Sequence, residues 1–210
     1  MPPYDACLLD VYETVLSFDQ VRHLDLLAQR AGVPPDDFVA AADAWSGRVT
    51  DGRASFAEAM AAVLDGCGSD ADPADLVALD RRLTRELAVL HPDTVPFLET
   101  LRAAGVRTAF VSNCNEHTRG LLDDLGLSCL VDELVLSFEV GVAKPDPKIY
   151  RIALDRLGAA PERAVLVDDQ QAYCDAAVGL GMAAIRIDRR GGGDIASLAE
   201  WDGADWGDAP

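Results

Sequence analysis

Five short apolar runs along the chain predict buried strands. They are residues 6–9, 108–111, 134–136, 164–167 and 183–187. Each run is apolar throughout and does not alternate with polar residues, which is typical of parallel strands that are covered on both faces. The sequence therefore predicts a mostly parallel sheet with helices on both sides.

Helical patterns of apolar residues separate these runs. One covers residues 95–104, and the others follow the second, third and fourth predicted strands. Each of the four predicted helices ends at a glycine, which accepts the left-handed conformation common after a last helical turn. These glycines are Gly105, Gly126, Gly158 and Gly181. The repeated order of helix, glycine, loop and strand predicts an α/β fold with a doubly wound sheet.

The stretch between residues 17 and 88 has a different pattern. It shows no convincing strand, and its apolar spacing predicts helices over 21–30, 38–45, 56–64 and 75–90. The segment Ser55–Glu58 has the sequence of a capping box at a helix start. We expect residues 1–16 and 89–210 to form the α/β core, and residues 17–88 to form a helical cap over the carboxyl edge of the sheet.

Composition and charge limit the partners of the chain. Its 210 residues include 36 acidic and 18 basic side chains, a formal net charge of −18 that disfavours nucleic acids and anionic membrane surfaces. The apolar runs are too short to span a bilayer, and the first residues do not resemble a signal peptide. The five cysteines form no metal-binding pattern. We therefore expect reduced thiols and a cytoplasmic location.

Polar residues follow four of the predicted strands. Ligands of open α/β sheets bind outside the carboxyl ends of the strands, so these side chains are candidates for one shared site. Helix capping would explain any one of them alone, but not four such strand ends in one chain. They are Asp10 and Thr14, Ser112 and Asn113, Lys144 within 141–147, and Asp168 with Asp169.

The carboxylates of Asp10, Asp168 and Asp169 would repel one another at this edge. At about 4 Å each ionised pair costs on the order of 4 kcal/mol for an effective dielectric constant of about 20. Lys144, one of two lysines in the chain, offsets only part of that repulsion. A hard divalent cation with oxygen ligands offsets the rest, so the sequence predicts a Mg²⁺ site.

In these motifs, and in the position of the helical insertion, the chain resembles the haloacid dehalogenase-like (HAD) hydrolase superfamily. Its phosphatases carry DxDxT after the first strand, Ser or Thr after the second, a lysine often within GxxKPDP, and an acidic pair after the fourth. The resemblance implies that Asp10 attacks phosphorus and forms an aspartyl phosphate, which water hydrolyses. It also implies that Thr14, Ser112 and Lys144 hold the oxygens of the transferred group.

The resemblance further implies the ligands of the metal and of the substrate. Mg²⁺ would bind Asp10, Asp169 and the backbone carbonyl of Tyr12, with Asp168 just behind them. A small phosphorylated metabolite would contact Ser112, Asn113 and Lys144. The helical cap would carry the substrate specificity.

Tyr12 departs from the phosphatase pattern. The family's phosphatases have an aspartate there, which protonates the leaving oxygen and then activates water, a contribution of about 10²–10⁴-fold. A tyrosine, with an ordinary pKa of about 10, can donate a proton but is a poor base. We expect an intact metal site with weakened turnover, because the metal ligand at this position is a backbone carbonyl.

Tyr12 leaves two alternatives open. The family's 2-haloacid dehalogenases have DxYGT in this place, and there the aspartate attacks carbon while a halide leaves without a proton. Those enzymes lack the acidic pair, bind no metal and hold the substrate carboxylate with an arginine of an aromatic-rich cap. The other alternative is a catalytically weak protein that binds a metabolite or a partner in the same cleft.

Three neighbouring residues have less certain roles. Glu13 replaces the glycine common in this turn; it bends the turn, supplies the missing acid or, as the commonest case, faces solvent. His117 is expected on the surface of the first turn of its helix. Cys114 has no obvious activating base, so we do not expect a nucleophile there.

Overall fold

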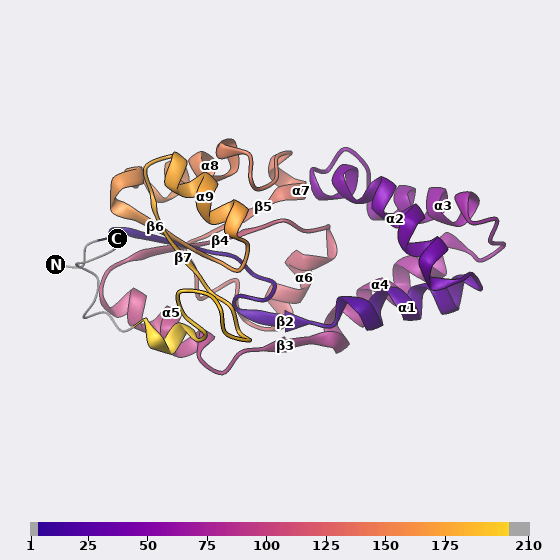
Figure 1. The fold of residues 1–210 in the computed structure, drawn as a ribbon, viewed down its shortest axis with the longest axis horizontal. Helices are drawn as coiled ribbons and strands as arrows, with labels where there is room; N and C mark the ends of the chain where they lie inside the picture. Colours follow the sequence, from indigo (N-terminus) through magenta and orange to yellow (C-terminus); the bar gives the residue numbers. More distant parts are fainter. Residues whose placement is uncertain (1–3, 202–210) are drawn as a thin grey trace.

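A computed structural model describes residues 4–201, and its centre is a five-stranded parallel sheet (Figure 1). The strands run in the order β5-β4-β1-β6-β7, and every neighbouring pair is parallel. This arrangement confirms the predicted fold class. The strands are β1 (Ala6–Leu9), β4 (Arg107–Ser112), β5 (Glu133–Leu136), β6 (Ala164–Asp168) and β7 (Ala183–Arg186).

Helices cover both faces of the sheet, as continuously apolar strands require. Leu9 of β1 packs with α5 (Thr94–Ala103) and α6 (His117–Asp124). Leu8, which points to the opposite face, packs with α8 (Pro147–Leu157) and α9 (Gln171–Gly179). The alternation of side chains along one strand thus creates two cores, one on each face of the sheet.

Four helices pack against one another in a separate layer, here named the cap helices (Figure 1). Their apolar faces enclose a third core that includes Leu27, Phe38 and Leu76. The predicted capping box is confirmed, since Ser55 and Glu58 exchange both hydrogen bonds at the start of a helix. The cap helices are α1 (Gln20–Ala31), α2 (Pro35–Thr50), α3 (Phe56–Gly66) and α4 (Pro73–Leu87).

A two-stranded antiparallel ribbon connects the cap helices to the sheet. It pairs β2 (Leu16–Phe18) with β3 (Ala88–Leu90), side by side in Figure 1. The predictions of no strand between residues 17 and 88 and of a helix reaching residue 90 were therefore wrong. Residues 88–90 continue the apolar pattern of α4, but their backbone pairs with residues 16–18, which lie far away in the sequence.

The remaining described elements are short. They are α7 (Ser137–Val140) and the 3₁₀ turns at Pro161–Arg163 and Leu198–Glu200. Trp201 packs on Phe97 of α5 with ring centroids 5.4 Å apart, whereas Trp206 lies outside the described residues. All five cysteines are unpaired. Within residues 4–201 no helix has both the length and the apolar character needed to cross a membrane.

Candidate active site

The predicted site residues meet at the carboxyl edge of the sheet. Asp10 directly follows β1, Ser112 ends β4, and Asp168 ends β6. Because β1 lies between β4 and β6 in the sheet, these three strand ends are neighbours. The parallel arrangement thus brings Asp10 beside two residues that are more than a hundred positions away in the sequence.

Lys144 links two of these carboxylates. Its Nζ lies 2.5 Å from an oxygen of Asp10 and 2.6 Å from an oxygen of Asp168. Its side chain is completely buried, and burial alone would lower the pKa of the ammonium group. The charges and hydrogen bonds of Asp10 and Asp168 outweigh that effect and raise the pKa above its usual value. The lysine is therefore a fixed positive charge beside Asp10.

Asp10, Asp168 and Asp169 each place one carboxylate oxygen within 4.8 Å of the others. Burial, opposed by Lys144 and reinforced by the two neighbouring carboxylates, raises the pKa of Asp10 to about 7. Burial and Asp168 also raise the pKa of Asp169. Three ionised carboxylates and one ammonium group leave two formal negative charges, which a divalent cation would neutralise. The donor set fits Mg²⁺, a cation that favours oxygen ligands.

Two hydroxyl groups of predicted site residues are buried without hydrogen-bond partners among the described residues. They belong to Thr14 and Ser112, both fully buried. A buried hydroxyl without a partner is costly, and such groups in a native protein call for an explanation. Phosphate oxygens as their partners, which the motif resemblance implies, stay a prediction.

Asn113 holds the loop that carries Lys144. Its side-chain oxygen accepts a hydrogen bond from the backbone N–H of Lys144 at 2.8 Å. Its amide nitrogen donates to the carbonyl of Lys144 at 2.8 Å and to the hydroxyl of Tyr173 at 3.2 Å. The structure thus shows Asn113 positioning Lys144, and the predicted contact of Asn113 with substrate stays a prediction.

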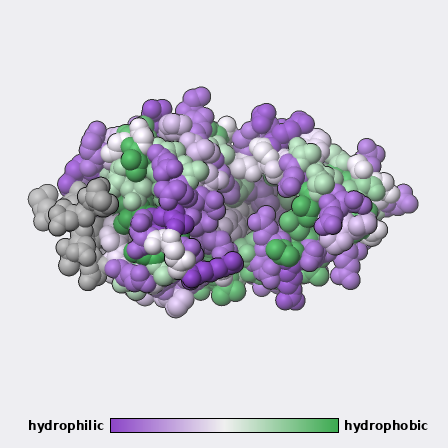
Figure 2. Space-filling view, in the orientation of Figure 1, coloured by the Kyte–Doolittle hydropathy of each residue, from purple (hydrophilic) through white to green (hydrophobic). Residues whose placement is uncertain are grey.

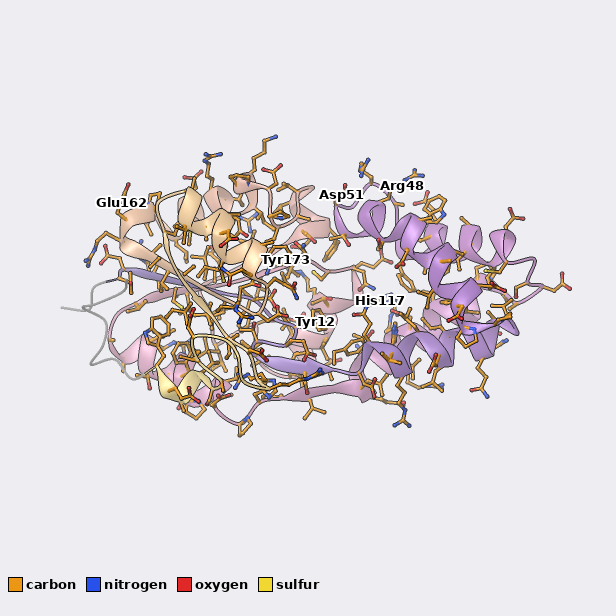
Figure 3. The ribbon with its side chains drawn as sticks, viewed as in Figure 1. Tyr12, Arg48, Asp51, His117, Glu162 and Tyr173 are labelled. Atoms are coloured by element: carbon orange, nitrogen blue, oxygen red, sulfur yellow. The ribbon has the colours of Figure 1, made fainter. Side chains whose placement is uncertain are left out.

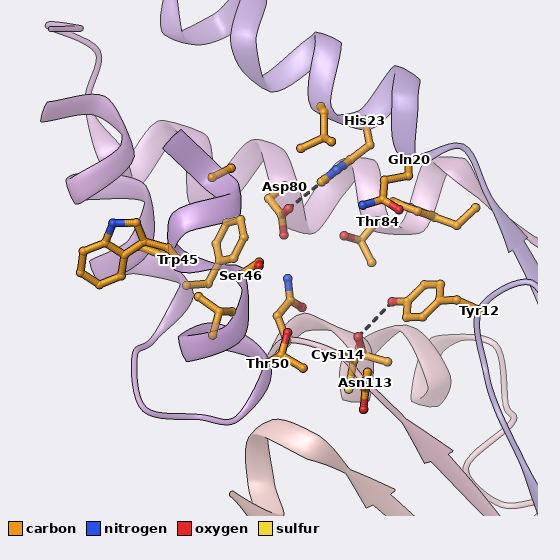
Figure 4. A pocket seen from close by; sticks show the side chains of 18 of the residues that line it. Tyr12, Gln20, His23, Trp45, Ser46, Thr50, Asp80, Thr84, Asn113 and Cys114 are labelled. Atoms are coloured by element: carbon orange, nitrogen blue, oxygen red, sulfur yellow. Dashed lines mark hydrogen bonds and ion pairs between the residues drawn. The ribbon is translucent and has the colours of Figure 1, made fainter. Parts of the chain in front are cut away.

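Tyr12 lies at the edge of the cavity above the site, with its hydroxyl 2.9 Å from Oγ1 of Thr118 (Figure 4). Its ring packs edge-on against Phe18. Burial raises the pKa of Tyr12 above its usual value, so the phenol stays protonated at any physiological pH. The side chain can donate a proton but cannot accept one at neutral pH.

Glu13 shapes the turn that follows Asp10. Its φ angle is +60°, a left-handed conformation that few residues other than glycine adopt. Its carboxylate accepts a hydrogen bond from the backbone N–H of Phe18 at 2.9 Å. Facing solvent was the commonest expectation for this residue; instead, its side chain helps close the turn.

Sequence reasoning missed a buried group formed by His23, Asp80 and His117. One carboxylate oxygen of Asp80 lies 2.8 Å from Nε2 of His23, and the other is hydrogen-bonded to Nδ1 of His117. The expectation of a surface position for His117 was wrong, because α4 covers it and only 7% of the residue is exposed.

One sequence signal pointed to this group. Asp80 shares the apolar face of α4 with Leu76 and Leu83, where a charged residue needs a partner. Burial would raise the pKa of Asp80, but the hydrogen bonds from the two histidines outweigh it and lower the pKa. The carboxylate therefore stays ionised between the cap helices and the sheet domain.

A cavity of about 550 Å³ lies between the cap helices and the sheet. Figure 2 shows the molecular surface hollowed between these two parts, and Figure 3 shows Tyr12 and Tyr173 at the sheet edge facing the cap. Asp10 and Asp169 lie on its sheet side, and residues of α1, α2 and α3 line the opposite side. The size is ordinary for a small-molecule site.

The family model of haloacid dehalogenase-like hydrolases matches residues 4–181. The chain belongs to this family. Two curated relatives match about half of the HAD chain: the GMP/IMP nucleotidase YrfG of Escherichia coli, 33% identical over 45% of this chain and 43% of its own, and (S)-2-haloacid dehalogenase 1 of a Pseudomonas species, 36% identical over 47% and 44%. The chain therefore spans less than half the length of these relatives.

A third relative matches nearly end to end. It is a phosphatase of Mycobacterium tuberculosis, 29% identical over 89% of this chain and 88% of its own. Among solved structures, a HAD family enzyme of Bacteroides thetaiotaomicron in complex with magnesium and inorganic phosphate superposes with a TM-score of 0.73. It covers 88% of this chain and 94% of its own at 17% identity, a likeness that shows the shared fold.

Proposed function

We propose that this HAD hydrolase is a Mg²⁺-dependent phosphatase of a small phosphorylated metabolite. The observation that carries the proposal is the cluster of Asp10, Asp168 and Asp169 beside the buried ammonium group of Lys144. The unpartnered hydroxyls of Thr14 and Ser112 support it. Phosphatases are among the relatives, and a structure with the same fold was solved in complex with magnesium and inorganic phosphate.

In this proposal Asp10 is the nucleophile. A carboxylate oxygen of Asp10 forms a bond to phosphorus while the bond from phosphorus to the ester oxygen breaks, which yields an aspartyl phosphate and an alcohol. Water then attacks the phosphorus and frees Asp10 and inorganic phosphate. Lys144 offsets charge on the nucleophile and on the phosphoryl oxygens, while Thr14 and Ser112 donate hydrogen bonds to those oxygens.

Mg²⁺ would be held by Asp10, Asp169 and the backbone carbonyl of Tyr12. It supplies positive charge against the phosphate oxygens when bound. Asp168 lies behind these ligands, because its two oxygens accept hydrogen bonds from Lys144 and from the backbone of Gln170. Asp168 then acts on the metal through the other carboxylates and through Lys144.

Tyr12 sets the rate in this proposal. Burial raises the pKa of its phenol, so the side chain is a weak acid toward the leaving oxygen and, while protonated, takes no proton from the attacking water. The leaving oxygen then gains its proton from solvent, and the attacking water loses one to solvent. Turnover is therefore weaker than in a HAD phosphatase with aspartate at this position. Residues 17–88 form the cap that contacts the leaving group, and residues 1–16 and 89–210 form the catalytic core.

Dehalogenation is the second candidate, favoured by Tyr12 and by the relative named a dehalogenase. In that reaction Asp10 would attack carbon and a halide would leave. The acidic cluster argues against it, since Asp168 and Asp169 repel an anionic haloacid. A catalytically weak protein that binds a metabolite or a partner in the same cavity is the third candidate.

A rate assay separates these candidates. With 4-nitrophenyl phosphate we expect release of nitrophenol that requires Mg²⁺, stops with EDTA and is lost in Asp10→Asn. Asp155→Asn, which changes an exposed carboxylate on α8, serves as the matched control. An unchanged rate in Asp10→Asn contradicts the proposal, and release of chloride from 2-chloropropionate without metal favours dehalogenation.

A further inference from the structure

The residues that line the cavity between the cap helices and the sheet determine which leaving groups can bind there. Its cap side is mainly apolar and rich in rings. The large apolar side chains there include Leu27, Phe38, Trp45, Phe56 and Met60, and Phe18 of the ribbon strand β2 also lines the cavity. A ring-bearing or otherwise apolar group would bury its surface against them, which favours binding in proportion to the apolar area removed from water.

The charges that line this cavity are almost all negative. They come from Asp10, Glu13, Asp80 and Asp169, and His23 is the single basic residue among the described residues that line it. Neither an arginine nor a lysine lines it within residues 4–201. A second negative group on a substrate would therefore find no lysine or arginine on these described walls to pair with, which costs binding energy.

Lys144, Arg53 and Arg48 lie beside this cavity without lining it. Arg48 stacks on the ring of Trp45, with its guanidinium carbon 4.5 Å from the ring centroid. Lys144 is buried and bound to Asp10 and Asp168, so its charge serves the phosphate end of the site. Arg53 lines a neighbouring cavity of about 450 Å³ and is paired with Asp51 at 2.7 Å.

The polar groups on the cap side are uncharged or already paired. Gln20, Ser46 and Thr84 face the cavity and offer neutral hydrogen bonds (Figure 4). Both carboxylate oxygens of Asp80, beside them, are already hydrogen-bonded, one to His23 and the other to His117. A leaving group in this space finds apolar surface and neutral donors and acceptors, and no lysine or arginine among the described lining residues.

We infer that the cavity selects phosphate monoesters whose leaving group is uncharged, largely apolar and ring-bearing, and that it rejects esters that carry a second anionic group. This inference rests on the proposed phosphatase function and narrows its substrate class. It follows from the lack of a lysine or arginine among the described lining residues, the aromatic cap wall and the buried, fully engaged position of Lys144.

Three primary alkyl phosphates test the inference, because their leaving oxygens are chemically similar. They are benzyl phosphate, 4-carboxybenzyl phosphate and glycerol 1-phosphate. We expect kcat/KM with Mg²⁺ to be at least about tenfold higher for benzyl phosphate than for either of the others. Equal or higher values for the carboxylated or the glycerol ester overturn the inference.

A substitution at Ser46 tests the cause. Ser46 is exposed on α2 and lines the cavity. In Ser46→Arg we expect the preference for benzyl over 4-carboxybenzyl phosphate to fall at least about fivefold, because the new guanidinium offers the missing counterion. Ser46→Gln, which adds bulk without charge, should keep the preference. A preference that is unchanged in Ser46→Arg, or that falls equally in both variants, contradicts the electrostatic cause.

A binding experiment separates failure of this inference from failure of the proposed function. Benzylphosphonate and 4-carboxybenzylphosphonate cannot be hydrolysed at their P–C bonds, so calorimetry with the full chain and Mg²⁺ measures recognition alone. If no ester is cleaved but benzylphosphonate binds at least about tenfold more tightly, the inference stands and the phosphatase proposal fails. Equal affinities, or the absence of binding by both, overturn the inference.

Discussion

His117 of the sheet domain and Asp80 of the cap helices share a hydrogen bond that is buried from solvent on both sides. The second oxygen of Asp80 is bonded to His23, so one carboxylate joins α1, α4 and α6. Removing one partner of a buried charge pair lowers the free energy of unfolding by several kcal/mol, because the other group stays buried without its partner. The hydrogen-bonded group of His23, Asp80 and His117 therefore stabilises the contact between the cap helices and the sheet domain.

Asp80→Ala should lower the free energy of unfolding by about 3 kcal/mol, because it leaves two histidine rings without their buried acceptor. Urea unfolding at pH 7 measures the change. Asp75→Ala removes an exposed carboxylate from the same helix, where it pairs with Arg30, and should cost less than about 1 kcal/mol. Equal losses in the two variants would show that the buried Asp80 group contributes no more to stability than an exposed ion pair.

The Asp80 group also predicts a pH dependence. The two histidines lower the pKa of Asp80 in the folded state, while the unfolded chain keeps a value near 3.8. The unfolded state therefore binds this proton more readily, and the stabilisation is complete above pH 3.8 and lost as the pH falls through the lower folded value. The stability difference between the wild type and Asp80→Asn should shrink in that acidic range; a constant difference contradicts the assignment.

Gly52 marks a second contact between the cap and the sheet domain. Its φ is +71°, and a Cβ at this position would overlap the backbone carbonyl oxygen of Phe138. Gly32 has the same φ of +71° but open space around it, which makes it a matched control. Gly52→Ala should have a free energy of unfolding about 1–3 kcal/mol lower than Gly32→Ala. Both variants strain the backbone equally, but only the new methyl group at residue 52 clashes with the carbonyl of Phe138. Thermal unfolding of both variants checks this.

The two lysines of the chain are also a matched pair. Lys144→Met removes the ammonium group beside Asp10 and Asp168 and should lower kcat at least about a hundredfold, because the carboxylates lose their fixed counter-charge. Lys148→Met changes an exposed residue at the start of α8 and should leave kcat within about twofold. A similar loss in both variants would remove Lys144 from the catalytic site.

Tyr12→Asp should raise phosphatase turnover at least about tenfold, because an aspartate can return the proton that the phenol cannot accept. Tyr12→Asn introduces a side chain of the same size as aspartate but without a basic group, so it should show no such gain. Steady-state kinetics with 4-nitrophenyl phosphate compares the three proteins. No gain in Tyr12→Asp would mean that the missing base does not limit the reaction.

Metal binding can be tested without turnover. Mg²⁺ at about a hundred times its dissociation constant should stabilise the folded protein by about 2.7 kcal/mol, which thermal unfolding detects as a rise in Tm. Asp169→Asn should lose most of that rise, whereas Asp155→Asn, on the outer surface of α8, should keep it. A full rise in Asp169→Asn would place the cation elsewhere.

The sequence by itself determined the sheet and the identity of the residues at its edge. Continuous apolar runs can only be buried on both faces, and the positions after them must then meet at one edge, so Asp10, Ser112, Lys144 and Asp168 could be grouped before their distances were known. Gly158 likewise ends α8 with φ of +60°, as a local pattern predicted.

Only the tertiary structure decided the contacts between segments that local patterns do not couple. The β2–β3 ribbon exists because residues 16–18 find residues 88–90, although the latter continue a helical pattern. His117 is buried because α4 lies over it, and the four acidic cavity residues face one space only after the cap has docked. Pairing and docking depend on surfaces built from distant residues, and no periodicity within one segment encodes them.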